Sequence, residues 1–128
     1  MLLHLTDTSA EPLHRQISRQ IREKILAGEL REGGELPSIR GMAADQRVSV
    51  ITVQRAYQDL EREGLIYTRR GIGIFVARLT EEQRKRLAVD RFREAAGPVV
   101  AGALAAGLSA EEITAIVERL VSLNGEMR

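Results

Sequence analysis

Residues 36–64 read LPSIRGMAADQRVSVITVQRAYQDLEREG, and two short helical patterns meet in this stretch at Arg47-Val48-Ser49. Ser38 suits the cap of a first helix that ends near Arg47, and Ser49 suits the cap of a second helix over residues 49–63. The second helix opens with the uncharged segment VITVQ. Such side chains gain little from water at a helix start, but they suit contacts with the edges of base pairs. The stretch therefore predicts a helix-turn-helix whose second helix reads the DNA major groove.

The flanking residues extend this motif into a winged helix-turn-helix. Residues 12–27 predict a preceding helix, because apolar side chains recur there every four residues. Residues 65–68 and 74–77 are short β-branched or aromatic runs, which predict a two-stranded hairpin with its tip at residues 69–73. We therefore expect a mostly α fold with a small β wing, in which residues 1–78 form the DNA-binding domain.

Residues 79–128 predict a two-helix tail that mediates dimerisation. Thr80 and Ser109 each begin a helix with a capping box, and Pro98 is expected to kink or divide the first of these helices. Two helices of about 45 residues bury too little surface to be stable alone, so we expect them to pack against a second copy. The apolar residues expected at this interface are Phe92, Ala96, Val99, Ala103, Ile113, Ile116 and Leu120.

Composition limits the classes of protein and of site. The chain has no cysteine, and its two histidines lack carboxylates at ligand spacing, so we expect no metal site. No nucleophile–base pattern or phosphate loop is present, so we expect neither enzymatic activity nor a cofactor. The longest uncharged segment, residues 95–110, is shorter than the roughly 20 residues that cross a bilayer, and no secretory signal is visible. We expect a cytoplasmic protein that binds no membrane.

Ten residues are the candidates for contact with DNA. Ile51 or the methyl group of Thr52 suits a thymine methyl, and Gln54 suits adenine. Arg40 and Arg55 suit a base or a phosphate, and the arginines of the wing tip suit the adjacent minor groove. The ten candidates are Arg40, Ser49, Val50, Ile51, Thr52, Gln54, Arg55, Arg69, Arg70 and Gly71.

Other interpretations of the same residues stay open at this point. Arg40 has Asp45 within reach as an ion-pair partner, and Arg55 has Asp59 one helical turn later. Arginines at a hairpin tip also serve solubility, and Ile51 suits a lightly exposed packing position. A winged motif that binds a protein partner instead of DNA is the alternative function. It predicts no salt-dependent binding to DNA.

The segments PLHRQISRQIREKILAGEL, LPSIR and VSVITVQRAYQDLEREGLIYTRRGIGIFV resemble the GntR family of bacterial transcription regulators over residues 12–77. The short tail resembles the YtrA subfamily. That resemblance implies a homodimer on a roughly palindromic operator, acting as a repressor and often controlling a transporter operon. It leaves any small-molecule effector unknown. An aminotransferase-fused regulator is not expected, because residues 79–128 are far too few for that catalytic domain.

The resemblance also implies roles for single residues. Arg40 matches the DNA-contacting arginine of the LPS-x-R motif, Ser49 and Thr52 match small hydroxyl residues that begin the recognition helix, and Gly71 matches the wing-tip glycine. Val50 is a departure, since many members carry arginine at that position. The operator of this chain is therefore expected to differ from theirs.

Overall fold

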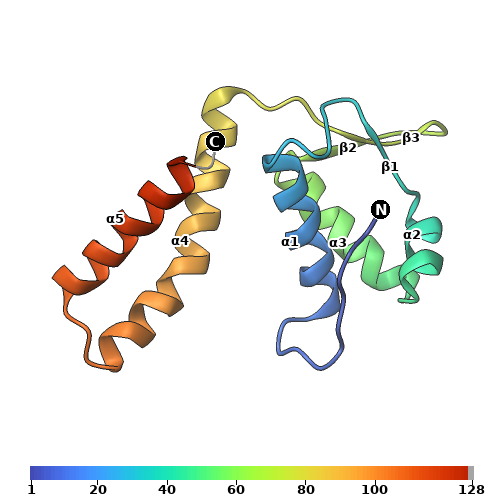
Figure 1. Ribbon diagram of the computed structural model, residues 1–128. Coiled ribbons are helices and arrows are strands. Elements are labelled where there is room, and N and C mark those ends of the chain that lie inside the picture. Colours follow the sequence, from blue (N-terminus) through green and yellow to red (C-terminus); the bar gives the residue numbers. More distant parts are fainter. Residues whose placement is uncertain (127–128) are drawn as a thin grey trace. The chain divides into compact units, whose positions relative to one another are not determined.

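The computed structural model describes residues 1–126 and contains five helices and three short strands in that range (Figure 1). In chain order the elements are α1 (Leu13–Leu26), β1 (Glu35–Leu36), α2 (Ile39–Gln46), α3 (Val50–Arg62), β2 (Ile66–Arg69), β3 (Gly73–Val76), α4 (Glu81–Ala105) and α5 (Ala110–Glu126). This is the predicted fold class, a mostly α chain with a small β wing and a helical C-terminal part. Contacts within the chain divide it into two compact units, Met1–Lys85 (unit 1) and Arg86–Arg128 (unit 2). The division falls inside α4, and the predicted boundary at residues 78 and 79 stays a prediction.

Unit 1 closes around one aliphatic core. α1 and α2 both pack against α3, and β2 follows α3 at the edge of the same core. The isoleucine stripe of α1 is buried, as its four-residue spacing predicts, whereas Leu13 at its beginning is only half-buried. The largest side chains with less than 2% exposure are Ile17, Ile21, Ile25, Met42, Val53, Leu60 and Leu65. This core holds the two helices of the helix-turn-helix in fixed positions.

The sheet has three antiparallel strands in the order β1-β3-β2, where the sequence predicted two. β2 and β3 form the expected hairpin, with Arg69 opposite Gly73. The additional strand β1 places Glu35 opposite Phe75 and Leu36 opposite Ile74. Two residues are too few to show a strand period, so this strand was not predicted from the sequence. β1 joins the residues just before α2 to the base of the wing.

The two caps of the helix-turn-helix form as predicted. Ser38 Oγ accepts a hydrogen bond from the Gly41 backbone N–H at 3.0 Å, and Ser49 Oγ accepts one from the Thr52 backbone N–H at 3.0 Å. Between the two helices, Arg47 has a φ of 57°, which makes it the one non-glycine residue with positive φ in the described chain. The chain reverses at this residue, so the turn depends on it.

An N-terminal segment along α1, which sequence analysis did not predict, is held by glutamine side chains. Gln16 is buried, accepts the Thr6 backbone N–H at 2.9 Å and donates to the Thr6 carbonyl at 2.7 Å. Gln20 forms the same pair of bonds with the backbone of His4. Gln46, at the end of α2, donates to the Met1 carbonyl at 3.1 Å. The segment therefore connects α1 with the end of α2.

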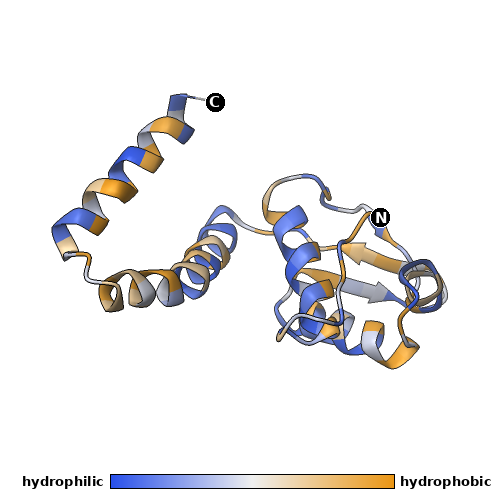
Figure 2. Ribbon diagram, turned by 60° about the horizontal axis from the view of Figure 1, so that its bottom comes forward, coloured by the Kyte–Doolittle hydropathy of each residue, from blue (hydrophilic) through white to orange (hydrophobic). Residues whose placement is uncertain are grey.

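Unit 2 contains α5 and most of α4, and neither helix has a buried residue. The predicted capping boxes form: Thr80 and Gln83 exchange two hydrogen bonds, and so do Ser109 and Glu112. α4 is continuous through Pro98, so of the two expected effects the division of this helix is wrong and the kink stays a prediction. Proline lacks only one backbone N–H, and the surrounding turns keep the helix intact. Figure 2 shows apolar residues alternating with polar ones along both helices.

Candidate nucleic-acid interface

The first turn of α3 is fixed on its inner side and accessible on its outer side. Ser49 Oγ caps the helix and also lies 2.7 Å from Thr52 Oγ1, so the two hydroxyl groups are bonded to each other. Val53 is fully buried in the core directly after them. In contrast, Val50 and Ile51 are 45% and 69% exposed. The side chains that sequence analysis assigned to base contacts are therefore open to a ligand.

Further candidates continue this accessible side along α3. Gln54 and Arg55 are exposed, and they follow Ile51 by three and four residues, which places all three on one face of the helix. Thr52 is half-buried, because its hydroxyl turns back to the cap. Arg40 is exposed on the first turn of α2, the helix that packs against α3. These candidates from α2 and α3 share one rigid motif.

The arginines of unit 1 differ in whether the protein provides a partner for them. Three are paired at 2.8 to 3.1 Å: Arg19 with Glu11, Arg22 with Glu63, and Arg62 with Asp59. Among the described residues of unit 1, seven exposed arginines have neither an ion pair nor a side-chain hydrogen bond, and five of them belong to the helix-turn-helix or the wing tip: Arg40, Arg47, Arg55, Arg69 and Arg70. Arg15 and Arg31 share this state, so position as well as pairing defines the candidate surface. The helix-turn-helix and the wing tip both carry uncompensated positive charge.

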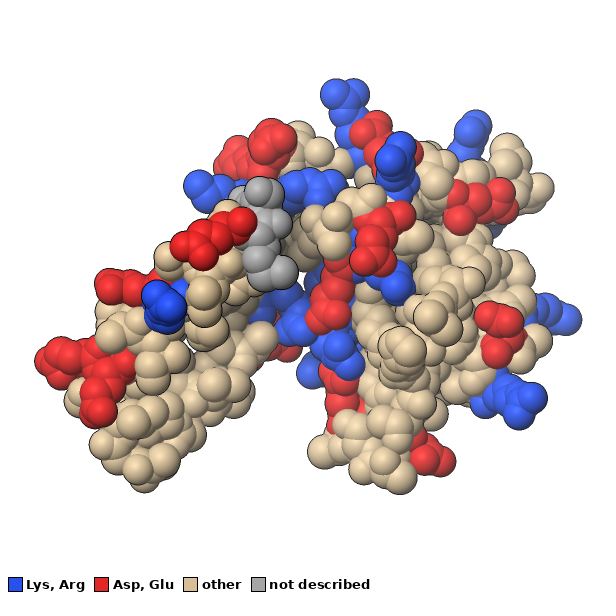
Figure 3. All heavy atoms as spheres, viewed as in Figure 1, with Lys and Arg blue, Asp and Glu red and all other residues tan. Residues whose placement is uncertain are grey.

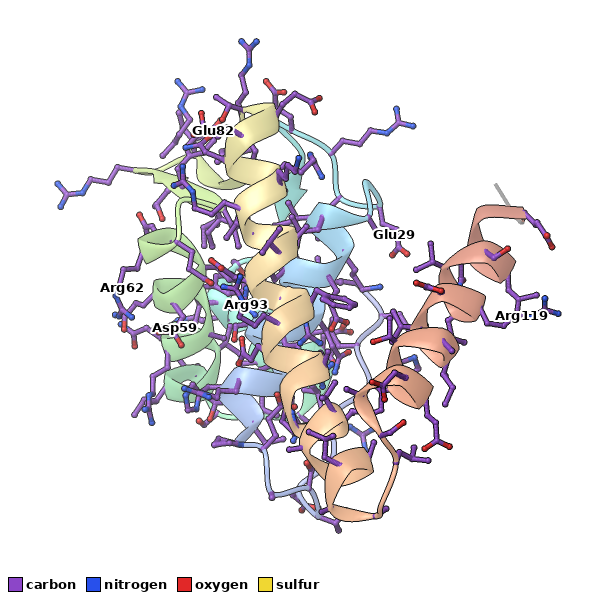
Figure 4. The ribbon with its side chains drawn as sticks, turned by 90° about the vertical axis from the view of Figure 1, so that its left-hand side faces the viewer. Glu29, Asp59, Arg62, Glu82, Arg93 and Arg119 are labelled. Carbon is purple, nitrogen blue, oxygen red and sulfur yellow. The ribbon has the colours of Figure 1, made fainter. Side chains whose placement is uncertain are left out.

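Both ion-pair interpretations left open by the sequence are wrong in this structure. Asp59 pairs with Arg62 and not with Arg55, and the two partners lie side by side on α3 (Figure 4). Asp45 accepts a hydrogen bond from Gln46 at 3.4 Å and makes no ion pair with Arg40. The guanidinium groups of Arg40 and Arg55 therefore remain available for a phosphate or a base.

The wing tip is one residue shorter at each end than predicted. Arg69 belongs to β2 and Gly73 to β3, which leaves residues 70–72 as the loop. The Ile72 backbone N–H donates to the Arg69 carbonyl at 2.9 Å. Gly71 has a φ of +73°, as a type II turn requires at its third position. The tip thus exposes Arg69 and Arg70 beside a residue without a side chain.

The structure adds two residues that sequence analysis missed. Arg47 is exposed in the turn between α2 and α3, where its left-handed backbone is usually left to glycine or asparagine. Tyr57 is buried on α3 and donates its hydroxyl to the Pro37 carbonyl at 2.8 Å. Burial raises the pKa of Tyr57 far above its usual range, so the hydroxyl stays a donor. The sequence signal for this hydrogen bond was a tyrosine within the apolar stripe of α3, because a buried hydroxyl group needs a partner.

Tyr57 has a positioning role for Arg40. Pro37 directly precedes the Ser38 cap of α2, and Arg40 lies in the first turn of that helix. The bond from Tyr57 therefore connects the start of α2 to the middle of α3. This bond therefore helps to fix the position of Arg40 relative to the outer face of α3.

The seven candidates for dimerisation line one apolar groove of about 720 Å³ in unit 2. Its walls come from α4 and α5, and its lining also includes Val100, Leu108, Val117, Val121, Asn124 and Gly125. Phe92 and Val99 are 67% and 71% exposed. Figure 3 shows a broad uncharged surface at the end of the unit where α4 and α5 are joined. The structure thus gathers these residues on one face, and their role in dimerisation stays a prediction.

Residues 1–126 also bear on two other classes of site. No helix in this range is long and apolar enough to span a bilayer. No group of three or more histidine, aspartate or glutamate side chains in this range is arranged to hold a metal ion.

Comparison with protein families matches residues 13–76 to the model of the bacterial regulatory proteins of the gntR family. The uncharacterized HTH-type transcriptional regulator YhcF of Bacillus subtilis is 42% identical over 73 residues, which are 57% of this chain and 60% of YhcF. The HTH-type transcriptional repressor YtrA of the same species is 33% identical over 101 residues, which are 70% of this chain and 78% of YtrA. The matched part is thus less than two thirds of YhcF and more than two thirds of YtrA.

A solved structure extends the likeness beyond the winged motif. A GntR family transcriptional regulator from Listeria monocytogenes superposes with a TM-score of 0.76 at 29% identity, covering 90% of this chain and 98% of that one. The coverage includes part of the helical segment after the wing. The likeness therefore concerns the winged motif together with its helical extension.

Proposed function

This chain belongs to the GntR family of bacterial regulatory proteins, and we propose that it is a repressor that binds a roughly palindromic operator as a homodimer. α3 enters the major groove, with Ser49, Val50, Ile51, Thr52, Gln54 and Arg55 at its leading end. Arg40 contacts the backbone or a base nearby, and the wing tip with Arg69, Arg70 and Gly71 lies at the minor groove. Binding takes place in the cytoplasm, where bacterial chromosomal DNA is found.

The unpaired arginines around α3 are the observation that carries this proposal. Unit 1 neutralises Arg22 and Arg62 within the chain but leaves Arg40 and Arg55 without carboxylate partners. Free guanidinium groups beside an exposed helix start suit phosphates and base edges. The same arrangement argues against the protein-adaptor alternative, because an adaptor has no need of unpaired arginines around α3.

The open groove of unit 2 supports the homodimer. Helices α4 and α5 have no buried residue, although Phe92, Val99 and Ile116 are large apolar side chains on one face. Leaving such side chains in water is unfavourable, at about 25 cal/mol for each Å² of apolar surface. A second copy offers the same apolar face, and a two-fold arrangement places two recognition helices roughly 34 Å apart, matching a palindromic site.

Repression and the regulated genes are the finer parts of the proposal. The relative YtrA is named a repressor, and the resemblance to its subfamily is the reason for proposing a transporter operon as the target. The relatives are regulators by name, so we propose a binding protein without catalytic activity. A transporter operon next to the gene would support the proposed target. Its absence would argue against that target but not against repression or DNA binding.

Arg40→Ala tests the DNA-binding surface. We expect promoter DNA to bind the variant about tenfold or more weakly, because a hydrogen bond from a charged group contributes roughly 1.5–3 kcal/mol. The slope of log affinity against log salt should fall by about 0.9 for each phosphate that the variant no longer neutralises. Arg15→Ala, which removes an unpaired arginine from α1, is the matched control and should change neither quantity. An Arg40→Ala protein that shifts the DNA as well as its parent would contradict the assigned role.

A further inference from the structure

The leading turn of α3 exposes two adjoining hydrocarbon side chains. Val50 and Ile51 are 45% and 69% exposed, although the rest of the apolar side of α3 is buried. Neither side chain has an atom that forms hydrogen bonds. A ligand that packs on these two side chains therefore needs apolar groups of its own.

The side-chain hydroxyl groups of the same turn are hydrogen-bonded within the protein. Ser49 Oγ accepts the Thr52 backbone N–H and lies within hydrogen-bond distance of Thr52 Oγ1. Thr52 is also half-buried beneath its exposed neighbours. The hydroxyl groups therefore support the turn, and Val50 and Ile51 present the chemistry that faces outward.

Among the base edges in the major groove, the apolar group is the C5 methyl group of thymine. We propose that Val50 and Ile51 select the operator by packing on thymine methyl groups. This inference rests on the proposed function, because it assumes that α3 enters the major groove. Successive residues of a helix point about 100° apart, so the two side chains contact different base pairs.

The surroundings of this apolar pair favour DNA over a protein as its occupant. Gln54 and Arg55 are exposed one turn later, and Arg40 and Arg47 are exposed without carboxylate partners in the described chain. An apolar pair bordered by free cations suits a groove lined by phosphates. An apolar protein surface gains nothing from those charges.

Methyl groups of the operator are the variable to test. A duplex is first selected from a randomised pool by the full-length protein, and each thymine is then replaced singly by deoxyuridine. This replacement removes the C5 methyl group and leaves the hydrogen-bonding edge intact. We expect one or two positions per half-site at which affinity falls about fourfold, from roughly 0.8 kcal/mol per buried methyl-sized group. Changing one such position in both half-sites should lower affinity about fifteenfold.

Two variants assign the effect to the side chains. Ile51→Ala should lose the response to deoxyuridine at one position and keep it at the others, and Val50→Ala should do the same at a neighbouring position. Leu2→Ala removes an equally exposed apolar side chain outside the motif, and it should keep the affinity and every response. Exchanging the critical T·A pair for C·G should weaken binding, and 5-methylcytosine at that position should restore part of it.

The outcomes separate this inference from the proposed function. Salt-dependent binding to the selected duplex with no response to deoxyuridine at any thymine would overturn the inference alone. Failure to select any duplex would overturn both, and it would favour a protein partner for the exposed pair. A response that persists unchanged in both alanine variants would also overturn the assignment to Val50 and Ile51.

Discussion

The two units of this chain differ in whether their apolar side chains are buried. In unit 1, side chains from α1, α2, α3 and the sheet meet in one core, and residues such as Ile21 and Leu60 are wholly buried. In unit 2, neither α4 nor α5 buries a residue, and Val99 is 71% exposed. The difference shows that unit 1 completes its own core, whereas unit 2 leaves its apolar face exposed.

The same contrast extends to polar groups. Unit 1 joins its elements through side chains, as in the Arg22–Glu63 ion pair at 2.8 Å and the Tyr57–Pro37 hydrogen bond at 2.8 Å. In unit 2 the hydrogen bonds of Ser109 and Asn124 stay within or next to α5. A two-helix unit in which neither helix buries a residue has little to fix it as a monomer.

Among the variants that test this contrast, Ile116→Glu should have the largest effect. A carboxylate in the groove of unit 2 must lose water if a second copy covers it, so we expect the dimer to dissociate. Operator affinity should then fall about 10²- to 10⁴-fold, because the two half-sites no longer bind as one. Sedimentation and DNA titration measure the two effects.

Arg119→Glu is the matched control for this prediction. Arg119 projects from α5 outside the residues that line the groove (Figure 4), so the variant should remain a dimer with near-normal affinity. A stable Ile116→Glu dimer would show that the groove is not the interface.

Paired truncations in the two units should sharpen the contrast with a smaller effect. Ile21→Ala removes a fully buried side chain of unit 1 and should cost about 2–5 kcal/mol in the free energy of unfolding at every protein concentration. Leu120→Ala removes a side chain that is half exposed in the single chain. Its cost should depend on protein concentration, since we expect this side chain to pack against the second copy. Urea unfolding at two protein concentrations measures both costs. A cost for Leu120→Ala that does not depend on protein concentration would contradict the proposed interface.

The helices of unit 1 could be predicted from sequence because each has a strong local signal. Isoleucines at four-residue spacing mark α1, and Ser38 and Ser49 mark the starts of α2 and α3. β1 has no such signal, because a two-residue strand exists only through its pairing with β3. The N-terminal segment is likewise held by glutamine side chains that are distant in sequence, as in the bonds between Gln20 and His4.

The sequence indicated which residues begin α3 and form the wing tip, but not which of the charged residues around them are paired. Local spacing allowed Arg55 to pair with Asp59, and only the folded structure shows that Arg62 takes this partner. The continuity of α4 through Pro98 could not be read from local rules either, since these rules allow both a kinked helix and a divided one at an internal proline. The exposure of Val50 and Ile51 followed from the position of the cap and was predicted.

Arg47→Gly tests the one place where unit 1 keeps an unfavourable backbone conformation. A left-handed conformation costs a residue with a side chain about 1 kcal/mol, and glycine avoids most of that cost. Because Arg47 is also an unpaired cation between α2 and α3, the variant should unfold at higher urea while binding DNA more weakly. Arg47→Lys keeps both the charge and the strain, so it should match the parent protein in each measurement. A rise in both stability and affinity in Arg47→Gly would mean that Arg47 does not contact DNA, whereas opposite changes would place this residue among the DNA contacts.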